Sequence, residues 1–172
     1  MTSWVLLSGL CVGLIIAAIT DIRHGRIPNR LTFSLSGFGL VGNSWLHGWE
    51  GFFWSVQGLG LGIVCLVFFY IKGGMGAGDV KLLGAIGAVI GPVHLFPAFL
   101  TAVILGGLYS LAMMISLGGW RSGWERLLAF LTTLKLTRTL PAGSSSSEPK
   151  LRYALVLGLG TIMAEIWAWY EG

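Results

Sequence analysis

Charged side chains are scarce in this sequence. Lys, Arg, Asp and Glu together make up 10% of the 172 residues, whereas an ordinary soluble domain carries about 25%. A soluble fold of this length would have too little polar surface to stay in solution. The scarcity of charge excludes a two-domain soluble enzyme, a large extramembrane domain and a disordered scaffold. It leaves one compact, membrane-embedded unit over residues 1–172.

Cysteine and histidine are equally sparse. Cys11 and Cys65 both lie in apolar segments, and no C-x-x-C pair or His/Cys cluster with metal-ligand spacing exists. We therefore expect neither a zinc ribbon nor a disulfide framework, no metal and no cofactor. The net charge of +4 comes without a dense basic run. This pattern favours contact with membrane lipids, including anionic headgroups, over binding to nucleic acid.

Long apolar runs, in contrast, are abundant. A membrane-crossing helix needs about 20 predominantly apolar residues, and the sequence contains six runs of about that length. We therefore predict an all-α membrane protein, a polytopic bundle of about six transmembrane helices. The predicted spans lie near residues 3–20, 31–49, 52–71, 80–96, 98–117 and 151–170.

The basic residues indicate the orientation of these spans. The connections at 21–30, 72–81 and 118–152 contain three, two and six basic residues, which are all eleven in the chain. The connections around 47–51 and 91–97 contain none. Under the positive-inside rule the first set is cytoplasmic, so both termini are predicted to lie outside.

Two further patterns bear on packing and on the last loop. Glycines one helical turn apart (Gly9/Gly13, Gly58/Gly62 and Gly87/Gly91) predict close approach of helix backbones. In the last cytoplasmic connection, apolar residues recur at helical spacing between charged ones over residues 120–134. We predict an interfacial amphipathic helix there; a helical cover over a cytoplasmic-side site is the alternative.

Only two aspartates occur, Asp21 after the first span and Asp79 before the fourth. The second and third spans run out and back between them, which returns both aspartates to one membrane face. Two carboxylates that share a proton can hydrolyse an amide without a metal. The helix dipole favours Asp79 as the ionised base and Asp21 as the protonated partner. The structural alternatives are a helix cap for Asp79 and an ion pair with Arg23 or Arg26 for Asp21.

Both aspartates fall in longer motifs, D-I-R-H-G-R-I-P-N at residues 21–29 and G-A-G-D-V-K-L at 76–82. The two motifs, in this order, resemble those of the type IV prepilin peptidase family, membrane aspartic proteases of the GxGD type. The resemblance covers the first four spans and continues more loosely at Tyr153-Ala154 and Gly158. The short form is most similar to the peptidases of tight-adherence (Flp) pilus systems.

The resemblance implies an activity and a site. Asp21 and Asp79 would be the catalytic pair of an endopeptidase of the inner (plasma) membrane. It would remove the short basic leader of a prepilin, or of a pilin-like secretion subunit, at the cytoplasmic face, after a small residue that is usually glycine. Larger family members carry a cytoplasmic domain with paired cysteines that methylates the product. Since no such pair exists here, we expect neither methyltransferase activity nor S-adenosylmethionine binding.

Six other motif residues are expected to shape the site or bind substrate: Arg23, Pro28, Asn29, Gly76, Gly78 and Lys81. The glycines would allow a backbone conformation or an approach that a Cβ would block. Pro28 would end the cytoplasmic excursion and Asn29 would cap the next helix. Arg23, expected in a loop, would be a partner of Asp21. Lys81 would point away from Asp79 and contact headgroups.

Two other functions are compatible with the sequence. The aspartates would bind a cation in a small cation-coupled transporter, or they would be inert in a non-enzymatic component of pilus or secretion assembly. Glu165, well inside the last span, is expected to make a hydrogen bond within the bundle or to lie close to the outer headgroups, far from the cytoplasmic face. The identity of the pilin, the pathway served, the oligomeric state and the association of the aspartates without substrate stay open.

Overall fold

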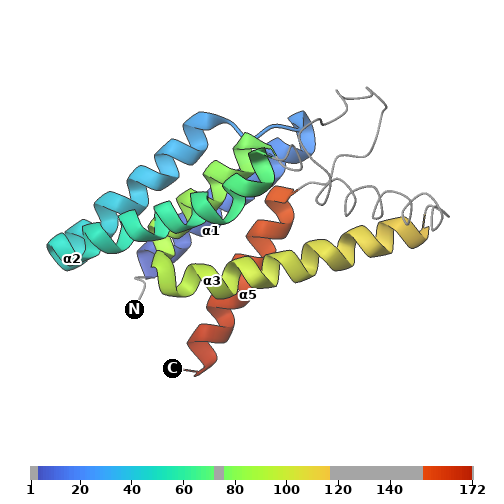
Figure 1. Ribbon diagram of the computed structural model, residues 1–172. Helices are drawn as coiled ribbons and strands as arrows, with labels where there is room; N and C mark the ends of the chain where they lie inside the picture. Colours follow the sequence, from blue (N-terminus) through green and yellow to red (C-terminus); the bar gives the residue numbers. More distant parts are fainter. Residues whose placement is uncertain (1–3, 72–75, 117–152, 172) are drawn as a thin grey trace. The chain divides into compact units, whose positions relative to one another are not determined.

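A computed structural model describes residues 4–71, 76–116 and 153–171 of the chain, and the described part is almost entirely helical (Figure 1). Its elements are α1 (Trp4–His24), α2 (Asn29–Ile71), α3 (Ala77–Ser116) and α5 (Tyr153–Glu171). The predicted all-α class is therefore confirmed for the described residues. The predicted amphipathic helix at 120–134 lies outside them.

The two long helices each reverse direction at a glycine. Gly48 in α2 has φ 60° and Gly91 in α3 has φ 77°, backbone conformations that interrupt the helix and that glycine adopts without steric cost. Each long helix therefore consists of two helical segments, and α2 folds back on itself as a hairpin (Figure 1). The first reversal lies one residue before the end of the predicted span 31–49 and within the connection predicted around 47–51.

The second reversal corrects the predicted boundary between spans 80–96 and 98–117. The chain turns at Gly91, and the second segment of α3 begins at Pro92 instead of after Pro97. Proline suits the first turn of a helix because the amide that it lacks would have no partner there. Pro97 lies inside the second segment, where Thr101 Oγ1 donates a hydrogen bond of 2.8 Å to the Pro97 carbonyl oxygen.

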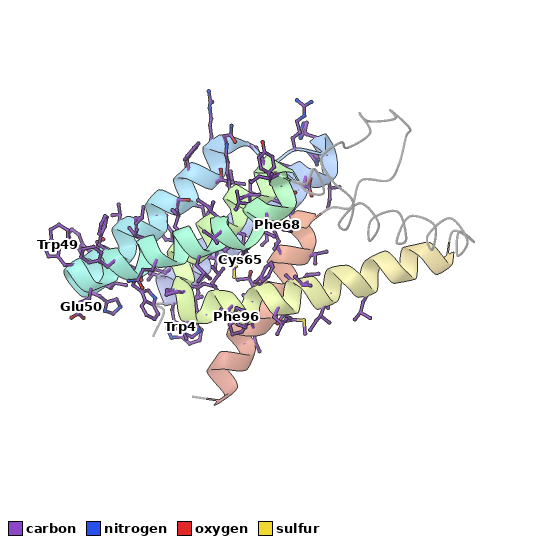
Figure 2. All side chains as sticks on the ribbon, in the orientation of Figure 1. Trp4, Trp49, Glu50, Cys65, Phe68 and Phe96 are labelled. Atoms are coloured by element: carbon purple, nitrogen blue, oxygen red, sulfur yellow. The ribbon has the colours of Figure 1, made fainter. Side chains whose placement is uncertain are left out.

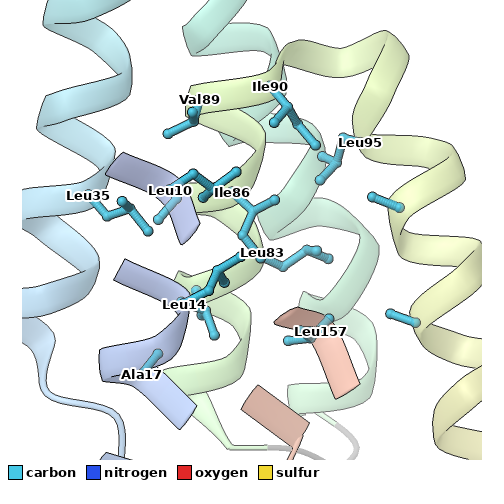
Figure 3. Close-up of a cluster of buried hydrophobic side chains, with 14 of the residues drawn as sticks. Leu10, Leu14, Ala17, Leu35, Leu83, Ile86, Val89, Ile90, Leu95 and Leu157 are labelled. Carbon is cyan, nitrogen blue, oxygen red and sulfur yellow. The ribbon is translucent and has the colours of Figure 1, made fainter. Parts of the chain in front are cut away.

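The first segment of α3 lies at the centre of the packing. Every residue from Leu82 to Gly91 is buried. Around this segment are the buried side chains of α1, α2 and α5, and Figure 3 shows Leu10 and Leu14 of α1, Leu35 of α2 and Leu157 of α5 converging on it. The helix that begins next to Asp79 is therefore held on several sides along its length.

The predicted close approach of helix backbones is found at Gly58, Gly62 and Gly87, whereas Gly9 and Gly13 meet side chains of α2. The space that a Cβ on Gly58 would occupy is filled by the backbone of Gly87, and the converse holds for Gly87. The hairpin and α3 are also linked by the buried amide of Asn43, whose Nδ2 lies 3.2 Å from the Ala88 carbonyl oxygen and 2.9 Å from Ser55 Oγ. Backbone contact and a buried amide together fix α2 against α3.

Residues 1–105 and 152–172 form one compact unit, and residues 106–151 form another. The described part of the second unit is the end of α3 at 106–116. Within the first unit, α1 packs against α2 and α5.

Three described helices are long and apolar enough to cross a membrane: Trp4–His24, Asn29–Phe68 and Ala77–Leu108. Many large apolar side chains on their outer surfaces are exposed, among them Val5, Val12, Trp45 and Val64. Lipid tails solvate such a surface, whereas water does not. The helices thus have the character of an integral membrane protein.

Candidate active site

Asp21 lies in the last turn of α1. The helix continues one turn beyond the predicted end at Thr20, to His24, and it closes at Gly25, whose amide donates a 2.9 Å hydrogen bond to the Asp21 carbonyl oxygen. Gly25 has φ 60°, as is common for the glycine that follows a helix. The Asp21 side chain is half-buried, and its Oδ2 atom is shielded from solvent without a hydrogen-bond partner in the described residues.

Asp79 lies in the first turn of α3. Its backbone amide donates a hydrogen bond of 3.1 Å to the Gly76 carbonyl oxygen, and its side chain is half-buried. A carboxylate in the first turn is stabilised by the positive end of the helix dipole. The Asp21 carboxyl lies near enough to interact electrostatically with that of Asp79. The structure thus places the two aspartates, 58 positions apart in the sequence, in the same region of the fold.

The two motifs meet through Ile27 and Gly78. Ile27, in the connection between α1 and α2, is buried, and a Cβ placed on Gly78 would lie 3.2 Å from its Cβ. A Cβ on Gly76 would lie 3.2 Å from Asp79 Oδ2. Of the two roles expected for these glycines, the structure favours close approach. The G-x-G-D sequence lets the start of α3 pack against the connection that follows Asp21.

Lys81 provides a second link between the motifs. Its Nζ donates a 3.1 Å hydrogen bond to Asn29 Oδ1 and lies 5.6 Å from the centre of the Phe33 ring, within range for a cation–π interaction. Lys81 was expected to contact lipid headgroups, and these contacts give it an additional role within the fold. The expected capping role of Asn29 is wrong. The α2 helix begins at Asn29 itself, and the preceding Pro28 supplies the carbonyl that accepts the Leu31 amide at 3.0 Å.

The sequence did not indicate the link from Lys81 to Asn29. These residues are 52 positions apart. They meet only because the N-terminal ends of α2 and α3 lie side by side. No local pattern in either motif indicates this contact.

Arg23 and Pro28 complete the set of expected site residues. Arg23 is helical and exposed, so the expectation that it lies in a loop is wrong. In the described part of the chain no ion pair joins Arg23 or Arg26 to Asp21. Pro28 is exposed and immediately precedes α2, as expected for a residue that ends the connection.

The arrangement fits acid–base chemistry at a pair of carboxyl groups. Two half-buried carboxyls that influence each other can hold one proton between them, which provides a base and an acid in the same place. Among the described residues no group of three or more His, Cys, Asp or Glu side chains could hold a metal ion.

Comparisons with known proteins identify relatives of this chain. Residues 8–111 match the Type IV leader peptidase family. A curated protein of Bacillus subtilis named prepilin leader peptidase/N-methyltransferase is 33% identical over 105 residues, which cover 60% of this chain and 42% of the relative. A protein of the same name from Burkholderia pseudomallei strain 1026b is 28% identical over 150 residues, which cover 81% of this chain and 44% of the relative.

A third relative with that name, from Xanthomonas campestris pv. campestris, is 35% identical over 92 residues, which cover 50% of this chain and 32% of the relative. The chain thus spans less than half the length of these curated relatives. No solved structure matches the chain significantly. The family match covers Asp21, Asp79 and most of the helices that position them, and the chain belongs to the Type IV leader peptidase family.

Proposed function

We propose that this chain is a membrane aspartic endopeptidase that removes the leader peptide of type IV prepilins or pilin-like secretion subunits. Asp21 and Asp79 are its catalytic residues. The observation that carries the proposal is the proximity of the two carboxyl groups, which come from separate motifs within the residues that match the family. The names of the curated relatives supply the class of substrate.

In the proposed reaction the ionised aspartate takes a proton from water while the other carboxyl donates a hydrogen bond to the scissile carbonyl. Water oxygen bonds to the carbonyl carbon, the C–N bond breaks, and the proton goes to the leaving amine. Asp79 is the base, because the N-terminus of α3 stabilises its charge. Asp21 is the protonated partner, because the C-terminus of α1 destabilises a negative charge.

The proposed site faces the cytoplasm at the inner membrane. Arg23, Arg26 and Arg30 lie around the connection between α1 and α2, and Lys81 lies in the first turns of α3. These basic residues are at the end of the helices that holds the aspartates, whereas the reversal at Gly48 carries none. The positive-inside rule then places the aspartates on the cytoplasmic side, with six spans and both termini outside.

A cleavage assay tests this proposal. The full chain, purified in detergent, is incubated with a full-length prepilin, and the products are analysed by mass spectrometry. We expect a leader fragment that ends in a small residue and that gains one ¹⁸O per turnover in H₂¹⁸O. We expect EDTA to leave the rate unchanged, because the two carboxyls need no metal. Stable binding of the prepilin without cleavage would instead indicate an assembly component.

The contact between Gly78 and Ile27 predicts a milder defect. Gly78→Ala places a Cβ 3.2 Å from Ile27 Cβ, so one of the two motifs must shift by a few tenths of an ångström. We expect kcat/KM for leader cleavage to fall about tenfold, since small displacements of catalytic groups slow reactions strongly. Gly37→Ala is the matched control, because a Cβ there meets no atom within 4 Å. Equal rates for both variants would contradict the proposed role of Gly78.

A further inference from the structure

An open cleft of about 250 Å³ lies away from the aspartates, at the ends of the helices near Gly48 and Gly91. Figure 2 shows Glu50, one of its lining residues, at the turn of the α2 hairpin. The cleft also contacts Ile90, 11 residues after Asp79 on the same helical segment, which corresponds to about 16 Å along the axis. The cleft is therefore separate from the proposed catalytic pair.

The floor and the rim of the cleft differ in character. Its floor is formed by the buried residues Asn43, Val89 and Ile90, and its rim by the more exposed His47 and Glu50, together with His94 and Trp54. Asn43 Nδ2 is already used by hydrogen bonds within the bundle. The ionisable and aromatic side chains that face a ligand are one carboxylate, two imidazoles and an indole ring.

Glu165 of α5 lies on one side of the His94 ring. Its Oε1 atom is shielded from solvent and lies 3.8 Å from His94 Nδ1. Because the two ring nitrogens face opposite sides of the imidazole, this contact leaves Nε2 for a ligand in the cleft. The hydrogen bond within the bundle expected for Glu165 is not found among the described residues; the contact with His94 is an ion-pair distance instead.

Apolar side chains surround this polar rim. Trp49 and Phe53 flank Glu50 along α2, Val93 and Phe96 flank His94 along α3, and all four are more than half exposed. The three rings of Trp49, Phe52 and Phe53 pack against one another at the hairpin turn, with centroids 5.8 to 6.3 Å apart. Aromatic side chains of this kind favour the boundary between lipid tails and headgroups.

We propose that this cleft binds the headgroup of a phospholipid that carries a primary amine, such as phosphatidylethanolamine. The Glu50 carboxylate accepts hydrogen bonds from the ammonium group, next to the face of Trp54. His47 and His94 donate to the phosphate oxygens. The acyl chains lie along the exposed apolar side chains outside the cleft.

The size and charge of the cleft favour this ligand over others. Its volume is below the roughly 300–1,000 Å³ of pockets that enclose drug-sized molecules, so a small polar group fits and an acyl chain does not. A purely anionic headgroup would be repelled by Glu50. A choline headgroup has no N–H donor for the carboxylate, whereas a primary ammonium has three.

Native mass spectrometry of the full chain at pH 7 tests the proposal. The protein is titrated separately with phosphatidylethanolamine, phosphatidylcholine and phosphatidylglycerol of equal chain length. We expect phosphatidylethanolamine to bind about fivefold more tightly than the other two lipids. This is the size of effect expected from one exposed charge pair. Glu50→Gln removes this preference and Glu50→Asp keeps part of it. His47→Gln weakens the binding of all three lipids. His24→Gln, a change at the distant end of α1, leaves the binding of all three unchanged.

Three outcomes would overturn the proposal. They are equal binding of the three lipids to the unaltered chain, an undiminished preference in Glu50→Gln, and binding of soluble phosphoethanolamine as tightly as of the lipid. Glu50 and His47 are exposed, so their replacement leaves the packed core intact. An unchanged circular dichroism spectrum confirms that each variant is folded.

Discussion

Replacement of Asp79 by asparagine should lower the rate of leader cleavage by about 10⁴-fold, the upper range for loss of a general base. Asparagine keeps the size of the side chain, and the backbone hydrogen bond from Asp79 to Gly76 does not involve the side chain. The start of α3 is therefore retained while the base is lost. The measurement is the initial rate of prepilin processing by the purified variant.

Asp21 should respond differently to the same change. If Asp21 donates a hydrogen bond to the scissile carbonyl, the amide of asparagine replaces that donor in part. Asp21→Asn should then be more active than Asp21→Ala, by about tenfold. No such difference is expected between Asp79→Asn and Asp79→Ala, because neither side chain can accept a proton. Equal residual rates in the two Asp21 variants would reverse the assignment of acid and base.

Thr20→Val is a suitable control for disturbance at the end of α1. The Thr20 hydroxyl donates only to carbonyl oxygens of its own helix, Ile16 and Ala17, both at 2.9 Å. This variant should cleave at a rate close to that of the unaltered chain. A fully active Asp79→Ala variant would show that the carboxyl pair is not the catalytic centre.

Local sequence patterns predicted much of this arrangement. The apolar runs gave the helices and the reversal near Gly48, because each run is long enough for a helix and ends at residues that interrupt one. The paired motifs gave the partners Asp21 and Asp79, since an out-and-back hairpin between them returns the chain to the same end. Glycines one turn apart, such as Gly58 and Gly62, gave the close contacts of the backbone.

Features that depend on three-dimensional packing were missed. The hydrogen bond from Lys81 to Asn29 requires two helix starts to lie side by side, and neither local sequence encodes that. The exact turn in α3 was misplaced because Pro92 and Pro97 are both residues at which a helix can end. Only the backbone shows that the turn lies at Gly91, which takes the positive φ, and that Pro97 is inside the second segment. The cleft lined by Glu50 and His94 lies where the turn of α2 and the turn of α3 come together. No sequence motif predicts that these turns meet.

The crossing of α2 and α3 predicts the largest effect on stability. In Gly87→Ala the new Cβ would overlap the carbonyl group of Gly58 and would lie 2.9 Å from Leu95 Cδ2. A backbone carbonyl cannot rotate away as a side chain does, so the helices must separate. We expect a decrease of about 3 kcal/mol in the free energy of unfolding, at the upper end for overpacking. The measurement is unfolding in detergent followed by circular dichroism.

Gly60→Ala makes the same chemical change where a Cβ meets no atom within 4 Å. Alanine is a better helix former than glycine by about 1 kcal/mol, so this control should be slightly stabilised, and the two variants should shift in opposite directions. Because α3 begins next to Asp79, separation of the helices also moves that carboxyl away from Asp21. Gly87→Ala should therefore lose stability and cleavage together, whereas Asp79→Asn loses cleavage alone. A Gly87→Ala variant with unaltered stability would rule out the backbone contact between the two helices.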